Sequence, residues 1–286
     1  MKSKLSLLFC LVLVFCSSGF TKGVDDESTL RISTLEEIKS EFDSVPCKNG
    51  DRLKSVKALF EKMGAKPEEI AVEKVKGVEN VVIRKASVNG STEKIVIGAH
   101  YDKTPNGCGA IDNWTGIVAL SHIYRTVKDL PLKKNIVFVA FGEEEKGLVG
   151  SSAMAGGIKK EQIDEYCAMI NIDSLGLGMT QVADNMSNKK LVEFAENLAK
   201  DMKAPFAHGV VAGGDSDSTS FNRKNIPALT IHAMTNDWPK ILHSSNDNPT
   251  KVNRESVYLG YRLALALLLR IDEADCQAFR DEKGKK

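Results

Sequence analysis

Residues 94–100, with the sequence KIVIGAH, form an apolar run that ends in a polar side chain. Three similar runs follow it, and helical patterns separate them: the runs are residues 135–141, 167–172 and 226–232, and the helices are residues 115–127, 150–158, 188–202 and 253–271. Strands without polar alternation are typical of a sheet that is covered on both faces. The order of elements therefore predicts an α/β fold, a single-domain three-layer sandwich whose mixed, mostly parallel central sheet is flanked by helices.

The residues before this alternating region predict two helices and a pair of strands. Residues 69–76 and 78–86 have the pattern of paired strands, and residues 51–63 form an amphipathic helix. A capping box within residues 33–37 begins an earlier helix that extends to about residue 42.

The composition is that of an ordinary globular protein. Of the 286 residues, 42% are hydrophobic and 27% are charged, and 39 basic side chains stand against 38 acidic ones. These values exclude long disordered regions, collagen-like repeats and coiled coils. Because the net charge is close to zero, we expect neither nucleic acid nor an anionic membrane as a partner.

The N-terminus has the pattern of a secretory signal peptide. Two lysines precede the apolar run of residues 5–15, and small residues follow it. The run is shorter than the roughly 20 apolar residues that a membrane-spanning helix requires. We therefore expect residues 1–19 to be removed and residues 20–286 to form one secreted or periplasmic domain without stable membrane association. A lipoprotein signal that ends at Cys16 is a minor alternative.

Four cysteines remain after the predicted cleavage: Cys47, Cys108, Cys167 and Cys276. In an exported protein they are expected to form disulfides, and three pairings are possible. The sequence leaves the choice open, although a Cys47–Cys276 bridge would join the two flanking helical segments. No C-x-x-C pattern is present, so we do not expect a cysteine zinc site.

Polar residues that suit a metal ion follow the carboxyl ends of the predicted strands. A single acidic residue at such a place is usually a helix cap or a solvated charge, and a lone histidine is usually structural. Here five groups occupy corresponding positions, at the edge where open α/β sheets bind their ligands. The groups are His100-Tyr101-Asp102, Asp112-Asn113, Glu143-Glu144-Glu145, Asp173 and His243.

These groups belong to motifs that resemble those of the secreted co-catalytic zinc aminopeptidases, the bacterial leucyl aminopeptidase-like metallopeptidases, which are related to the glutaminyl cyclases. The family motifs H-x-D, G-A-x-D-N-x-x-G, E-E-x-G-L-x-G-S and H-x-x-x-D occur in order, beginning at His100, Gly109, Glu144 and His243. The resemblance covers roughly residues 95–249. It implies the zinc-peptidase fold for residues 20–286.

The resemblance implies two zinc ions as cofactors. One ion would be held by His100, Asp112 and Asp173, and the other by Asp112, Glu145 and His243, so that Asp112 bridges them. Imidazole nitrogen and carboxylate oxygen are suitable zinc ligands.

The resemblance also implies roles for the neighbours of these ligands. Asp102 would orient His100, because residues two apart in an extended chain leave the same face. Glu144 would be the general base, taking a proton from a water and delivering it to the leaving amine. A register shifted by one residue is the alternative for the three consecutive glutamates. A cis peptide bond is implied between Asp112 and Asn113.

The leading hypothesis is an exported zinc-dependent aminopeptidase, a monomer that hydrolyses N-terminal residues from peptide substrates. The alternatives are a glutaminyl cyclase with one zinc ion, a carboxypeptidase or dipeptidase specificity on the same scaffold, and a non-catalytic binding domain. A binding domain is expected to have lost ligands, and none is missing. The preferred N-terminal residue stays open, since Ser218 replaces a family histidine and Trp238 fits either a pocket wall or simple packing.

Overall fold

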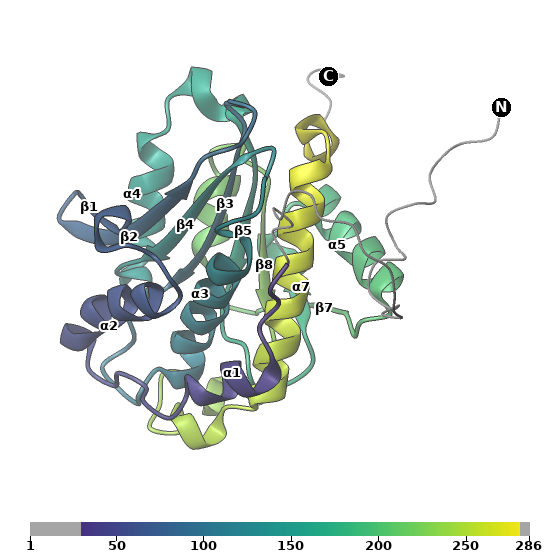
Figure 1. Cartoon of the computed structure of the whole chain (residues 1–286). Coiled ribbons are helices and arrows are strands. Elements are labelled where there is room, and N and C mark those ends of the chain that lie inside the picture. Colours follow the sequence, from purple (N-terminus) through teal and green to yellow (C-terminus); the bar gives the residue numbers. More distant parts are fainter. Residues whose placement is uncertain (1–29, 281–286) are drawn as a thin grey trace, which may run out of the picture.

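The computed structural model describes residues 30–280 (Figure 1). The signal peptide predicted for residues 1–19, including Cys16, lies outside these described residues. Within residues 30–280, no helix combines the length and the apolar character that crossing a membrane requires.

Eight strands in the described part of the chain form one sheet, in the order β1-β2-β4-β3-β5-β8-β6-β7. The central strands β4, β3, β5 and β8 run parallel to one another, whereas the β1–β2, β2–β4 and β6–β8 pairs are antiparallel. The prediction of a mixed, mostly parallel sheet is therefore confirmed. The strands are β1 (Ala71–Val75), β2 (Val78–Lys85), β3 (Lys94–His100), β4 (Asn135–Phe141), β5 (Tyr166–Ile172), β6 (Gln181–Ala183), β7 (Ala207–Gly209) and β8 (Ala228–His232).

Helices cover both faces of this sheet, as Figure 1 shows. The helices α3 and α7 contact each other on one face, and α4 and α6 contact each other on the opposite face. The helices are α1 (Leu35–Ser40), α2 (Asn49–Lys62), α3 (Thr115–Val127), α4 (Val149–Gly157), α5 (Lys189–Met202), α6 (Asp217–Asn222) and α7 (Arg254–Glu273).

The apolar strands alternate their side chains between two cores. In β3, Ile95 and Ile97 lie in the larger core with α3 and α7, whereas Val96 lies in the smaller core with Phe221 of α6. Both sets are fully buried. Burial on both faces explains why these strands show no polar alternation in the sequence.

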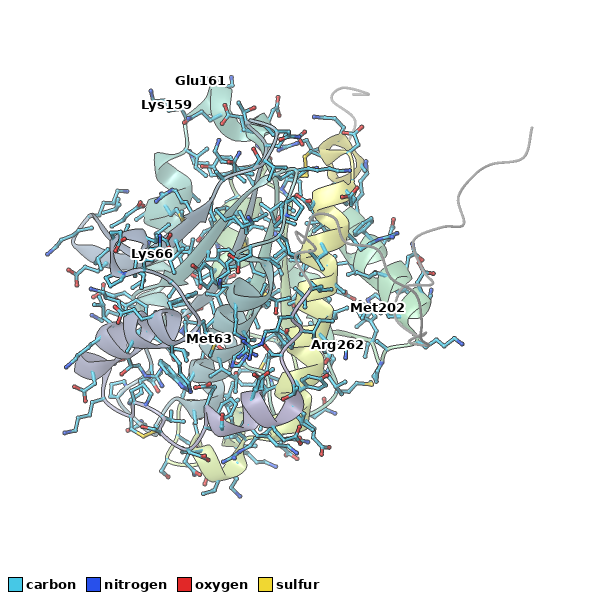
Figure 2. The ribbon with its side chains drawn as sticks, viewed as in Figure 1. Met63, Lys66, Lys159, Glu161, Met202 and Arg262 are labelled. Atoms are coloured by element: carbon cyan, nitrogen blue, oxygen red, sulfur yellow. A yellow bond between two sulfur atoms is a disulfide. The ribbon has the colours of Figure 1, made fainter. Side chains whose placement is uncertain are left out.

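The parallel strands place their carboxyl ends at one edge of the molecule. In Figure 2 the labelled Lys159 and Glu161, which precede β5 in the chain, lie at the top of the view. The amino end of β5 is therefore near the top, and the carboxyl ends of the parallel strands point downward. Polar residues that follow these strands are consequently brought together at the lower edge.

Two short strands and one short helix were not predicted. The strands β6 and β7 have three residues each and α6 has six, too few to show a periodic pattern. The capping box is present, with the Thr34 hydroxyl accepting from the Glu37 N–H at 3.2 Å, but α1 ends at Ser40.

The disulfides join Cys47 to Cys108 and Cys167 to Cys276. The Cys47–Cys276 pairing considered from the sequence is therefore wrong. Cys47 precedes α2, and its partner Cys108 lies in the loop that follows β3. Cys276 follows α7, and its partner Cys167 lies at the start of β5. Each flanking segment is thus fastened to the sheet region rather than to the other flank.

Candidate active site

The carboxyl edge of the sheet brings together the residues predicted to bind metal. His100 ends β3, Glu144 and Glu145 begin a short 3₁₀ helix after β4, and Asp173 follows β5. Asp112 lies in the segment that leads into α3, and His243 lies in the loop before α7.

Asp112 lies between the two histidines. Its Oδ1 is 3.0 Å from Nε2 of His100, and its Oδ2 is 3.1 Å from Nε2 of His243. Glu145 completes the second group, with Oε2 3.2 Å from the same His243 nitrogen. One carboxylate therefore faces two imidazoles with its two oxygens, which is the arrangement expected of a bridging ligand.

Asp173 and Glu144 complete the group around His100. Oδ1 of Asp173 is 3.4 Å from Nε2 of His100. Potential ligand atoms of His100, Glu144 and Asp173 lie within 4.8 Å of one another, as do those of His100, Asp112 and Glu145. His100 therefore belongs to two overlapping sets of ligand-type side chains.

The three consecutive glutamates have different surroundings. Glu143 is half-buried and accepts a hydrogen bond from Lys146 at 2.8 Å. Glu144 and Glu145 instead face the cluster. The geometry therefore places the second and third glutamates in the site and the first outside it.

Asp102 fastens the glutamate segment to the end of β3. Its two carboxylate oxygens accept the backbone N–H groups of Glu144 at 2.9 Å and Glu145 at 3.2 Å. Oδ1 of Asp102 is also 3.5 Å from Nδ1 of His100. Asp102 thus lies behind His100, where a residue that orients this imidazole would be expected.

Further buried groups hold the segment that contains Asp112. Asp247 accepts the N–H of Ile111 at 2.7 Å and that of Asp112 at 3.1 Å. The Asn113 amide donates to the carbonyl of Ile172 at 2.9 Å, at the end of β5. The peptide bond between Asp112 and Asn113 is cis, as the resemblance implied.

The cluster concentrates negative charge in a buried place. Burial raises the pKa of Glu144 well above its ordinary value and also raises the pKa of Glu145. Hydrogen bonds to Asp112 and Glu145 raise the pKa of His243 to about 10. Acidic groups that raise one another's pKa in a buried site gain stability from a bound cation.

The donor set fits zinc. It offers two imidazoles and several carboxylates, which are the ligand types that zinc takes in catalytic sites. The Oε1 atom of Glu145 is buried, and no group within residues 30–280 forms a hydrogen bond with it. A buried carboxylate oxygen without a partner is expected where an ion belongs.

A cavity of about 470 Å³ opens beside this cluster. One part of its wall is polar, formed by the cluster itself, and another part is apolar. The apolar wall contains Met186, Val211, Met234, Trp238 and Leu242. Trp238 therefore lines the cavity, and it also packs against the core.

Two buried residues near the site were missed from the sequence. His232 ends β8 and lines the cavity, although no metal-binding motif surrounds it in the sequence. Its position at a strand end was the available signal. Asp217 is fully buried, and burial raises its pKa to about 7.

Ser218 does not take the place of the family histidine in the cavity. The residue is fully buried, and its hydroxyl donates to the carbonyl of Met186 at 3.1 Å. Among residues 30–280, the side chains that line the cavity do not include Ser218. His122 is buried in α3, with its Nδ1 2.8 Å from the Ser33 hydroxyl.

Known proteins share this fold and sequence pattern. Aminopeptidase YwaD of Bacillus subtilis (strain 168) is 27% identical over 169 residues, which are 56% of this chain and 37% of that protein. The structure of a zinc aminopeptidase from Bacillus subtilis aligns with a TM-score of 0.61 at 22% identity, over 71% of this chain and 53% of that one. An Acidobacteriales bacterium glutaminyl cyclase aligns with a TM-score of 0.71 at 16% identity, over 90% of this chain and 99% of that one.

The structural alignments, at these identities, show a shared fold. The chain spans well under two thirds of the length of both Bacillus subtilis proteins. The family model described as peptidase family M28 matches residues 80–268, which is more than half of the chain. This match confirms the resemblance stated from the motifs, and the chain belongs to peptidase family M28.

Proposed function

We propose that this protein is a zinc-dependent aminopeptidase that removes N-terminal residues from peptides. The observation that carries the proposal is the position of Asp112, whose two carboxylate oxygens face His100 and His243. Asp173 and Glu145 stand beside these histidines, and Glu144 faces the same cavity.

Five side chains would hold two zinc ions. His100, Asp112 and Asp173 form one ligand set, and Asp112, Glu145 and His243 form the other. Zinc at such a site supplies Lewis acidity toward a peptide carbonyl and an attacking water. Asp102 holds the N–H groups of Glu144 and Glu145, which fixes the glutamate segment relative to His100.

Glu144 would act as the general base. Its carboxylate lines the cavity, and burial raises its pKa well above that of an exposed glutamate. A carboxylate with a raised pKa accepts a proton from the attacking water more readily than an ordinary one. The same carboxyl group then returns the proton to the amine that leaves.

The apolar wall of the cavity is suited to the side chain of the substrate's N-terminal residue. Met186, Met234 and Trp238 present apolar surface on the same cavity that the cluster lines. An apolar side chain placed there would leave water and so contribute to binding.

A glutaminyl cyclase is the second candidate, because a protein of that name aligns over 90% of this chain with a TM-score of 0.71. The set of two histidines with Glu145 and Asp173 favours the two-zinc peptidase.

We also propose that the protein is exported, as a monomer, to a secreted or periplasmic location. The two disulfides support export, since disulfides persist in oxidising compartments.

The deciding experiment measures bound zinc per chain and the turnover of a panel of aminoacyl 4-nitroanilides, with glutaminyl peptides included. We expect two zinc ions per chain and release of 4-nitroaniline that stops when a chelator removes the metal. One zinc ion together with pyroglutamate formation would instead establish the cyclase. Bound zinc without turnover of any substrate would indicate a binding domain.

A further inference from the structure

Arg52 is the largest side chain that is completely buried in the described part of the chain. It belongs to α2, which precedes the residues that the family model matches. No carboxylate within residues 30–280 forms an ion pair with it, and its guanidinium lies 5.6 Å from the ring of Trp114. Burying a cation without an anionic partner is unfavourable unless hydrogen bonds replace its hydration.

Backbone carbonyls provide those hydrogen bonds. Nε donates to Pro46 at 2.9 Å, within the segment that precedes α2. Nη1 donates to the carbonyls of Tyr101 at 2.9 Å and Asp102 at 3.3 Å. Nη2 donates to the carbonyls of Cys108 at 2.8 Å and Gly109 at 2.6 Å. A guanidinium has five N–H groups, so each of them has a carbonyl acceptor.

Four of these carbonyls belong to the two segments that carry proposed zinc ligands. Tyr101 and Asp102 directly follow His100, and Cys108 and Gly109 precede Asp112 by a few residues. One planar guanidinium therefore sets the distance between the end of β3 and the segment with the bridging carboxylate. The fit is tight, because a Cβ atom on Gly109 would lie 2.8 Å from Nη2 of Arg52.

Two further contacts fix the start of α2 to the same loop. The Asn49 amide donates to the carbonyl of Lys103 at 2.7 Å and accepts the Lys103 N–H at 2.9 Å. The Cys47–Cys108 disulfide joins the chain before α2 to the same loop. We call Cys47, Asn49 and Arg52 the N-terminal clamp.

We propose that the N-terminal clamp positions the metal centre, with Arg52 as a positioning residue that holds His100 and Asp112 at the spacing required to bind the same ion. This inference rests on the proposed function. Burial lowers the pKa of Arg52 to about 10, and the negative charges of Asp247 and Asp112 oppose this shift, so the guanidinium stays charged near neutral pH.

The test measures zinc affinity of the metal-free, full-length mature protein by competition with a chromophoric chelator. The visible absorption of the cobalt-substituted protein reports the ligand geometry in parallel. The variants are Arg52→Met and Arg52→Lys, and circular dichroism establishes that each is folded. Loss of a group that orients ligands typically weakens metal binding by about 10- to 100-fold. We expect a loss of this size and an altered cobalt spectrum for Arg52→Met, with partial recovery in Arg52→Lys.

Arg280→Met is the matched control. The Arg280 guanidinium also donates to three backbone carbonyls, those of Ile163, Tyr166 and Asn225, near the starts of β5 and β8 at the opposite edge of the sheet. We expect this variant to unfold at a lower temperature while keeping wild-type zinc affinity. A weakening of zinc binding equal to that of Arg52→Met would overturn the proposal.

Asn49→Ala keeps the proposal testable if Arg52→Met does not fold. Asn49 is exposed, and its replacement removes the two hydrogen bonds to Lys103 without opening the core. We expect several-fold weaker zinc binding, and unchanged affinity in a folded clamp variant would refute the role of the clamp. Absence of zinc binding in the wild-type protein would instead contradict the proposed function, so the two failures are distinguishable.

Discussion

His232 makes the stability of the fold depend on pH. The side chain is 3% exposed, and its Nδ1 accepts the N–H of Met234 at 3.3 Å. Nε2 is buried without a hydrogen-bond partner among residues 30–280. Burial lowers the pKa of His232 to about 4, and the charges of Asp173 and Asp184 oppose this shift without cancelling it. The folded protein therefore keeps this imidazole neutral.

The sign of the effect follows from proton binding. Between about pH 4 and the ordinary histidine value of about 6.5, the unfolded chain binds more protons at this position than the folded chain. The contribution is fully present above pH 6.5 and is lost as the pH falls. With a folded pKa of about 4, lowering the pH from near 7 to near 5 reduces the unfolding free energy by about 2 kcal/mol through this group.

Urea unfolding of the metal-free protein measures this contribution. Wild type and His232→Gln are compared near pH 7, 6 and 5, so that groups shared by both proteins cancel in the difference. We expect the variant to gain about 2 kcal/mol relative to wild type on going from the highest to the lowest pH. An unfolding free energy difference that stays constant over this range would refute the neutral, buried state of His232.

Three further predictions concern catalysis and packing. Glu144→Gln is expected to keep two zinc ions but to lower the turnover of aminoacyl 4-nitroanilides by about 10²- to 10⁴-fold. The matched change Glu143→Gln is expected to leave turnover intact. Near-normal activity of Glu144→Gln would remove Glu144 from its role. Gly98→Ala would place a Cβ atom 2.5 Å from a ring carbon of Phe141. We expect the unfolding free energy to fall by about 1–3 kcal/mol, which is measured as a lower melting temperature. An unchanged melting temperature would contradict this packing. Lys134→Met removes two hydrogen bonds of 2.8 Å to carbonyls at the C-terminal end of α7. Urea unfolding is expected to show an unfolding free energy that is lower by about 1–3 kcal/mol. An unchanged unfolding free energy would mean that water replaces these hydrogen bonds.

Much of the fold was predictable because its central strands are buried on both faces. The expected bounds of α3 and β4, residues 115–127 and 135–141, agree with the structure. The polar residues on both sides of an apolar segment indicate where the element begins and ends. The strands β6 and β7 were not predictable in this way. Each has three residues, and both depend on pairing with partners that are distant in the sequence.

The candidate ligands were predictable because they lie next to strand ends in the sequence. His100 ends a recognisable apolar strand, Asp173 and the glutamate segment each follow one, and parallel strands bring such positions together at one edge. His232 occupies the same kind of position but was overlooked. No metal motif surrounds it, and its effect comes from burial, which depends on the residues that β8 packs against.

The groups that hold the ligands in place could not be predicted, and Arg52 shows the physical reason. In the sequence it is one charged residue in an amphipathic helix, where a charge is normally solvated. Its burial depends on five carbonyls, four of which lie about 50 residues away in the sequence, at the two ends of the loop that follows β3. Those carbonyls are available to accept because residues 101–109 have no regular secondary structure whose hydrogen bonds would use them. The topology that brings the candidate ligands together at this edge of the sheet therefore also leaves backbone carbonyls there, and a cation from a distant helix satisfies them.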